Sequence, residues 1–234
     1  MSISLNIAEV QQRTVNASRR VGRQPQEVVL MAVSKTHPAE RIREAYGGGI
    51  RVFGENRVQE FAGKASSLLD LADAQWHMIG HLQSNKAAKA AELFGAVDSL
   101  DSLKLAERLN EAAESQNKKI PVLIEMNVGG ETAKSGVPPE SRDFEDLLLA
   151  APRFEALEFR GLMTVPPFSE DAEGARPYFR RLREIRDTIA RRKLAAISMD
   201  VLSMGMSHDF EVAVEEGSTC VRVGTAIFGE RPKP

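Results

Sequence analysis

A lysine stands at the end of a long uncharged run near the start of the chain. Lys35 follows residues 28–34, which contain no charge, and an apolar, β-branched run of this length is typical of a buried strand. An amine at the edge of an apolar interior loses hydration, which lowers its pKa and favours the neutral nucleophile. Such an amine forms Schiff bases with aldehydes and ketones. A lysine that only extends from a strand end into solvent also fits this position.

Two glycine-containing turns near the end of the chain carry the chemistry of a phosphate site. Residues 205–207, Gly-Met-Ser, lead into a predicted helix at 209–216 and offer backbone N–H groups, a hydroxyl and the positive end of a helix dipole. Gly224 and Thr225 offer similar groups after the next predicted strand. Either turn alone is an ordinary glycine turn. On adjacent strands they favour a phosphate site.

Arg222 lies inside the last predicted strand among valines and a glycine. We expect its side chain to point inward, and a buried guanidinium needs an acceptor because it keeps its proton. The nitrogen of a pyridine ring and a structural carboxylate such as Glu230 both fit that requirement. A Schiff-base lysine beside a phosphate site implies a ligand with a carbonyl and a phosphate. Pyridoxal 5′-phosphate (PLP) and phosphosugars are the two candidates.

Short apolar runs alternate with helical patterns along the whole chain. The predicted strands are 28–34, 51–53, 76–79, 96–100, 121–127, 159–165, 201–204 and 221–228. The predicted helices are 3–21, 38–46, 57–69, 85–94 behind Ser84 as N-cap, 102–115, 139–150, 170–192 and 209–216. Eight strands separated by helices favour parallel pairing with right-handed crossovers.

This alternation predicts an α/β fold, a single (β/α)8 TIM-type barrel formed by one domain over residues 1–234. A further helix within residues 1–21 would pack on the outside of the barrel. A doubly wound open sheet also alternates strands and helices but usually has fewer strands. In a barrel of this type the site lies where the strands end, which would bring Lys35, Arg222 and both glycine turns to one mouth.

Composition excludes several classes of protein. The formal net charge is −2, with 31 Lys+Arg against 33 Asp+Glu, so nucleic acids and anionic membranes are not expected partners. Cys220 is the one cysteine and four histidines show no metal-ligand spacing, so neither a disulfide framework nor a metal site is expected. No apolar stretch approaches the ~20 residues of a membrane span. We expect a cytoplasmic monomer.

Long motifs distributed along the chain carry a resemblance to a known family. They are residues 32–36 (AVSKT), 53–60 (FGENRVQE), 76–86 (WHMIGHLQSNK), 134–136 (KSG), 161–164 (GLMT), 202–209 (LSMGMSHD) and 222–229 (RVGTAIFG). Over its whole length the chain resembles the PLP-binding homeostasis proteins, known as PROSC or PLPBP in eukaryotes and as the YggS family in bacteria. Their fold is similar to the PLP barrel of bacterial alanine racemases.

The resemblance implies that Lys35 carries PLP covalently as a Schiff base. It implies a cofactor site in which Ser207, Gly224 and Thr225 hold the phosphate, Arg222 faces the pyridine nitrogen, and Asn56 and Met204 line the ring pocket. Lys134 matches a lysine with a secondary, cofactor-handling role in the family. One departure is His37, because many members carry a second lysine at this position.

The function we predict is PLP homeostasis, in which the protein stores the cofactor or delivers it to PLP-dependent apo-enzymes without appreciable catalysis. The alternative is a PLP-dependent amino-acid racemase of the alanine racemase type. That reaction needs a second acid/base group, and the only tyrosines, Tyr46 and Tyr178, fall on predicted outer helices. Arg222 also cannot protonate the ring nitrogen fully. A Schiff-base aldolase acting on a phosphosugar is a third hypothesis, in which Arg222 would have no ring nitrogen to meet.

Overall fold

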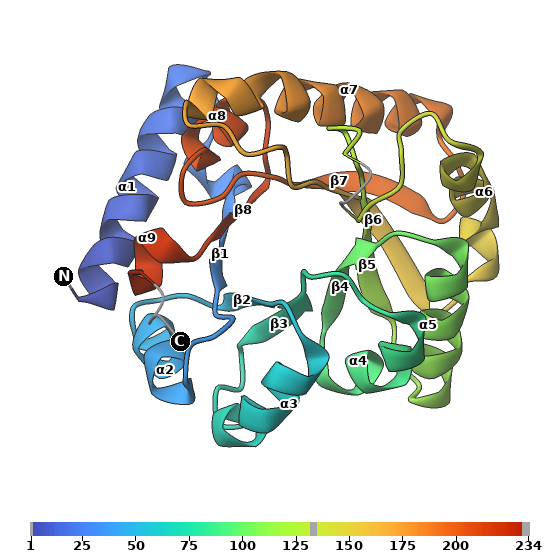
Figure 1. Ribbon diagram of the computed structural model, residues 1–234, viewed down its shortest axis with the longest axis horizontal. Helices are drawn as coiled ribbons and strands as arrows, with labels where there is room; N and C mark the ends of the chain where they lie inside the picture. Colours follow the sequence, from blue (N-terminus) through green and yellow to red (C-terminus); the bar gives the residue numbers. More distant parts are fainter. Residues whose placement is uncertain (1, 132–134, 231–234) are drawn as a thin grey trace.

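Eight parallel strands close into a barrel in the computed structural model, which describes residues 2–131 and 135–230 (Figure 1). Neighbouring strands follow the order of the chain, and β8 pairs with β1 to complete the ring. The strands are β1 (Val29–Val33), β2 (Val52–Glu55), β3 (Gln75–Met78), β4 (Ala96–Leu100), β5 (Ile120–Glu125), β6 (Leu157–Met163), β7 (Ile197–Ser203) and β8 (Cys220–Val223). The predicted TIM-type barrel is confirmed.

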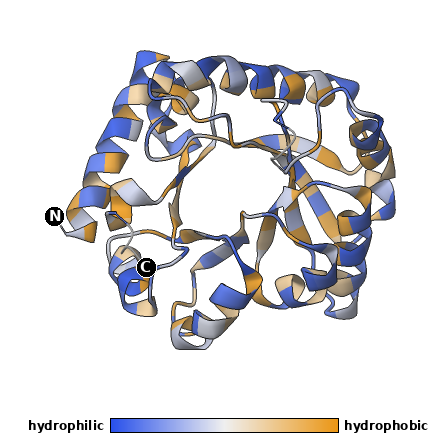
Figure 2. Ribbon diagram, viewed as in Figure 1, coloured by the Kyte–Doolittle hydropathy of each residue, from blue (hydrophilic) through white to orange (hydrophobic). Residues whose placement is uncertain are grey.

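Helices surround the ring of strands and turn their apolar faces toward it (Figures 1 and 2). They are α1 (Ile3–Arg20), α2 (Ala39–Gly47), α3 (Val58–Ala65), α4 (Ala87–Leu93), α5 (Leu103–Ser115), α6 (Arg142–Ala150), α7 (Arg176–Arg192), α8 (Phe210–Glu215) and α9 (Thr225–Phe228). The extra N-terminal helix, α1, begins behind a Ser2 cap and buries Ile3, Ile7 and Val10. These side chains lie three or four residues apart, so they form one stripe on the helix.

The end of the chain differs from the prediction. A strand over 221–228 is wrong, because β8 ends at Val223 and Thr225–Phe228 form the short helix α9. The carbonyl of Gly224 accepts two backbone hydrogen bonds from this helix, each 2.9 Å long. Asn6 of α1 also donates to the helix at 2.8 Å. The apolar residues that resemble a strand therefore pack against α1 as a helix.

Helix starts account for two smaller differences. The helix predicted from residue 139 begins at Arg142, where the Ser141 side chain accepts a hydrogen bond from the Phe144 amide at 3.2 Å. Ser84 is not an N-cap, because it opens a short 3₁₀ turn that precedes α4. Proline and serine both favour helix starts, so sequence alone placed these boundaries a few residues early.

Neither a membrane-spanning helix nor a metal-binding cluster is found in the part of the chain that the structure describes. Within it, no helix has both the length and the apolar character needed to cross a membrane. The same residues contain no cluster of three or more His, Cys, Asp and Glu side chains that could hold a metal ion.

At Gly161 the backbones of β6 and β7 approach so closely that no side chain fits between them. A Cβ atom at this position would lie 1.9 Å from the Val201 carbonyl oxygen of β7. The register between β6 and β7 shifts between Phe159 and Gly161, so the absence of a side chain lets β6 follow its neighbour through this irregularity. The carboxyl-terminal half of β6, which leads toward the mouth of the barrel, depends on that fit.

We predict that Gly161→Ala lowers the free energy of unfolding by about 3 kcal/mol or more, because a backbone atom must move to admit the methyl group. Gly63→Ala is the matched control, since Gly63 is exposed on α3 and a Cβ there meets nothing within 4 Å. Alanine at Gly63 should gain up to about 1 kcal/mol from helix propensity. Urea unfolding of both variants measures the two values, and equal effects would contradict the proposed fit at β6.

Candidate functional site

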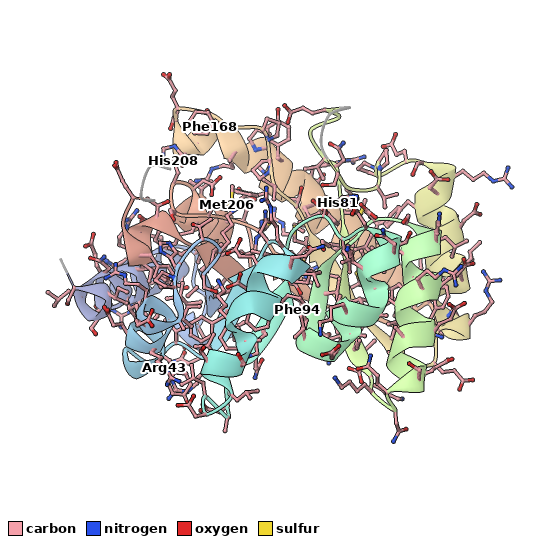
Figure 3. The ribbon with its side chains drawn as sticks, turned by 60° about the horizontal axis from the view of Figure 1, so that its bottom comes forward. Arg43, His81, Phe94, Phe168, Met206 and His208 are labelled. Carbon is pink, nitrogen blue, oxygen red and sulfur yellow. The ribbon has the colours of Figure 1, made fainter. Side chains whose placement is uncertain are left out.

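The carboxyl-terminal mouth of the barrel contains a cavity of about 420 Å³. Of the predicted site residues, Lys35, Asn56 and Arg222 line it, together with His81, Glu125 and Met206. Figure 3 shows His81 and Met206 at the same end of the molecule as the exposed Phe168. A cavity of this size can enclose a small cofactor.

A buried polar network fixes the loop that carries Lys35. Directly before it, the Ser34 hydroxyl donates to Glu55 Oε1 at 2.5 Å. Glu55 ends β2 with a fully buried side chain, and Lys64 Nζ of α3 lies 2.8 Å from the same oxygen. The Lys64 amine also donates to the Ser34 carbonyl at 3.1 Å. Three elements thus hold the turn in which Lys35, half-buried, reaches the cavity.

The partners of Glu55 offset only part of the cost of burying its charge, and its Oε2 atom has no hydrogen-bond partner among the described residues. Burial raises the pKa of Glu55, while the Lys64 ammonium and the Ser34 hydroxyl act in the opposite direction. A buried carboxylate needs such partners to remain in place. Glu55 and Lys64 therefore support the loop, and neither is among the residues lining the cavity.

His37 follows Lys35 in the same loop and contacts the last helix. Its ring stacks on Phe228 of α9, with centroids 4.5 Å apart, and the residue is 9% exposed. It is not among the residues that line the cavity. In this chain the position joins the β1 loop to the last helix.

Arg222 is buried, 3% exposed, and points into the barrel as predicted. Its guanidinium donates to Ser203 Oγ at 2.8 Å and to the Thr164 carbonyl at 2.7 Å. Glu230, the carboxylate weighed as a partner, is exposed at the end of α9 and is not one of these acceptors. Burial lowers the pKa of Arg222, and the charges of nearby acids, Glu125 among them, oppose that shift.

The two glycine turns meet beside β1. Ser207 Oγ accepts hydrogen bonds from the amides of Gly224 and Ala226, both at 3.2 Å. A Cβ on Gly224 would lie 3.5 Å from Val33, which itself lines the cavity. Thr225 is exposed at the start of α9. The predicted phosphate-site residues therefore lie together next to the cavity wall.

The remaining predicted residues are placed differently. Met204, directly after β7, is fully buried and is not among the residues lining the cavity, where Met206 is found instead. Lys134 lies outside the described residues. His77, from the 76–86 motif, pairs through Nδ1 with Asp98 at 3.0 Å.

Glu125 is the cavity residue that sequence reasoning missed. It ends β5, is 7% exposed, and its Oε2 atom has no hydrogen-bond partner among the residues that the structure describes. Burial raises its pKa to about 7, with a further contribution from the Asp101 charge, while Arg222, His81 and the Ser135 hydroxyl act in the opposite direction. The sequence does contain a signal, because Glu125 closes an apolar strand just as Lys35 does.

Comparison with known proteins first identifies the class of barrel to which this fold belongs. The family model of the alanine racemase N-terminal domain matches residues 5–232. The alanine racemase of Streptomyces coelicolor shares the fold, with a TM-score of 0.70 at 20% identity over 97% of this chain and 59% of that one. The fold and site thus define a barrel of the alanine racemase N-terminal domain class.

More similar relatives identify the family within that class. Proteins named pyridoxal phosphate homeostasis protein are 47% identical in Aquifex aeolicus, over 99% of both chains, and 44% identical in Pseudomonas aeruginosa, over 98% and 96%. PipY of Synechococcus elongatus, solved with PLP bound, has a TM-score of 0.82 at 37% identity over 97% of this chain and 100% of that one. The chain belongs to the pyridoxal phosphate homeostasis protein family.

We predict that Glu125→Gln changes how stability depends on pH. The folded protein holds the Glu125 proton more tightly than the unfolded chain, so this group costs stability as pH rises from 4.5, its ordinary pKa, to about 7. The loss amounts to about 3 kcal/mol. Glutamine does not titrate, so the variant escapes this loss. Its free energy of unfolding minus that of the wild type should therefore increase as pH rises. Urea unfolding between pH 4.5 and 8 measures the difference, and a constant difference would contradict the raised pKa.

Proposed function

We propose that this protein binds PLP as a Schiff base on Lys35 and stores it or delivers it to PLP-dependent apo-enzymes. The observation that carries the proposal is that Lys35, Asn56 and Arg222 line a single cavity of about 420 Å³. PipY, a relative that covers nearly the same length, has been solved with PLP bound. The whole of residues 1–234 would act as one cofactor-binding domain.

The chemistry at Lys35 is a condensation. The neutral amine attacks the aldehyde carbon, a carbon–nitrogen double bond forms, and the aldehyde oxygen leaves as water. Lys35 suits this step because it is half-buried at the end of an apolar strand, and reduced hydration favours the neutral amine.

The other residues orient the cofactor. Ser207, Gly224 and Thr225 hold the phosphate, supported by the convergence of two amides on Ser207 Oγ. Arg222 faces the pyridine nitrogen, and Asn56 lies beside the ring. Met204, which is fully buried, would pack behind the ring pocket, and Met206 lines the cavity itself. This arrangement favours a pyridine ligand over a phosphosugar, for which Arg222 would have no ring nitrogen.

A role without appreciable catalysis is supported by the positions of the two tyrosines and by Arg222. Tyr46 lies on α2 with its hydroxyl bonded to Asp73, and Tyr178 lies on α7, so neither tyrosine reaches the cavity. A guanidinium at the ring nitrogen withholds the proton that would make the ring a strong electron sink. The fold shared with alanine racemases is the observation that supports the racemase alternative. A cytoplasmic location and a monomeric state stay predictions.

Lys35→Ala should abolish the visible absorbance of the Schiff base after incubation with PLP, because no other amine on the cavity wall replaces it among the described residues. Lys86→Ala is the matched control, since Lys86 also follows a barrel strand but is not among the cavity-lining residues. Absorbance titration with PLP compares both variants with the wild type. A full Schiff-base spectrum in Lys35→Ala would contradict the proposal.

We also expect no racemase turnover of physiological size. Loss of one acid/base group typically costs 10²–10⁴-fold in rate, so exchange of the α-proton should stay below about 1 s⁻¹, the lower end for ordinary enzymes. Nuclear magnetic resonance of L- and D-alanine in deuterated buffer with the PLP-loaded protein measures the exchange. Turnover above that rate would favour the racemase alternative.

A further inference from the structure

The carboxyl of Glu125 faces the cavity from the side of the barrel opposite Lys35. In a closed ring of eight strands, β5 lies across from β1, and Glu125 and Lys35 line the same cavity. Ser135 supplies a hydroxyl to this carboxyl, whereas within the described part of the chain the buried Oε2 atom has no hydrogen-bond partner. Native proteins rarely leave a buried polar atom unpaired, and a missing ligand is one explanation for such an atom.

The charges around Glu125 come from four other elements. Asp101 follows β4 and His81 follows β3, and these two side chains form a hydrogen bond of 2.8 Å with each other. Arg222 of β8 bonds to Ser203 and Thr164, and Lys35 follows β1. His81 is thus engaged by Asp101, and Arg222 has acceptors of its own, so neither of these two side chains is committed to Glu125.

Such surroundings favour the neutral acid. Burial and the Asp101 charge raise the pKa of Glu125 to about 7 despite Arg222 and His81. A carboxylic acid kept neutral in an apolar site can donate a hydrogen bond, which a carboxylate cannot. The unpaired Oε2 is the oxygen available to carry that proton.

We propose that Glu125 contacts bound PLP, donating a hydrogen bond from its protonated carboxyl to an acceptor atom of the cofactor, and that its ionisation weakens cofactor retention. The inference rests on the proposed function, because it requires PLP in this cavity. Ionisation would remove the donor and place a negative charge beside an anionic, phosphate-bearing ligand. Retention should thus be strong in mildly acidic solution and weaker in mildly alkaline solution.

The size of the effect follows from the protonated fraction. If only the neutral form of Glu125 holds the ligand, the apparent dissociation constant rises as that fraction falls. For a pKa of about 7, the fraction is roughly nine-tenths at pH 6 and roughly one-thirtieth at pH 8.5. Affinity should therefore fall by up to about 30-fold over this range.

The test uses 4′-deoxypyridoxine 5′-phosphate, which lacks the aldehyde and so binds without a Schiff base. Its dissociation constant is measured by calorimetry at pH 6, 7 and 8.5 for the wild type, Glu125→Gln and His81→Gln. Glutamine keeps a donor at position 125 but does not titrate. Between pH 6 and pH 8.5 we expect the affinity of the wild type to fall by about 30-fold. The fall in Glu125→Gln should be smaller than the fall in the wild type by a factor of at least five. The ligand also has groups that titrate in this range. Their effect is the same for both proteins, so it cancels in the ratio of the two dissociation constants.

Carbon-13 resonance of the Glu125 carboxyl in the ligand-free wild type gives a second readout that does not depend on how the variants fold. A protonated carboxyl at pH 6 that ionises near pH 7 supports the inference. An equal pH dependence in the wild type and Glu125→Gln would overturn it, as would loss of the dependence in His81→Gln alone. Failure of the wild type to bind PLP and its analogue at every pH would instead contradict the proposed function itself.

Discussion

Closure of the barrel by the pairing of β8 with β1 is the constraint on which the site depends. The register places Met31 opposite Arg222, so the strand that leads to Lys35 lies directly beside the strand that carries the buried guanidinium. Nearly the whole chain separates these residues in sequence, and only a closed ring makes them neighbours. The same pairing brings Gly224 against Val33 and thus sets the Ser207 turn beside the cavity.

Buried charge is the second feature that shapes the mouth of the barrel. Glu55 is compensated by Lys64 and the Ser34 hydroxyl, and that compensation holds the Lys35 loop. Arg222 is compensated by a hydroxyl and a carbonyl, which leaves its orientation fixed before any ligand arrives. For Glu125 the described residues show no ion pair like that between Glu55 and Lys64, and burial raises its pKa. Two of the three charges are therefore structural, and the third is free to respond to a ligand.

The sequence was sufficient for the architecture and for part of the site. Alternating apolar runs and helical stripes predicted all eight strands, and the uncharged run before Lys35 predicted a lysine at the mouth. Arg222 could be placed inside the barrel because its neighbours on the strand are apolar. These features depend on local patterns that tertiary structure preserves.

Other features depend on contacts that local patterns do not reveal. The residues of α9 have the composition of a strand, and only their packing against α1 and the hydrogen bonds to Gly224 make them helical. Met206 lines the cavity while Met204 is buried and does not line it, and the chain turns between them at Gly205, which has a positive φ. Glu125 could not be predicted as a site residue from the sequence. The lack of a hydrogen-bond partner at its Oε2 atom is seen only once the side chains of the neighbouring strands are placed.

The central claim is that Lys35 is the amine that holds the cofactor. Its most direct test is reduction of the PLP-loaded wild type with borohydride, followed by mass spectrometric mapping of the modified peptide. We predict a single pyridoxyl group on Lys35. Lys64 is the informative competitor, because its amine lies in the same loop region but is bound to Glu55 at 2.8 Å. A label on Lys64, or one spread over several lysines, would contradict the account.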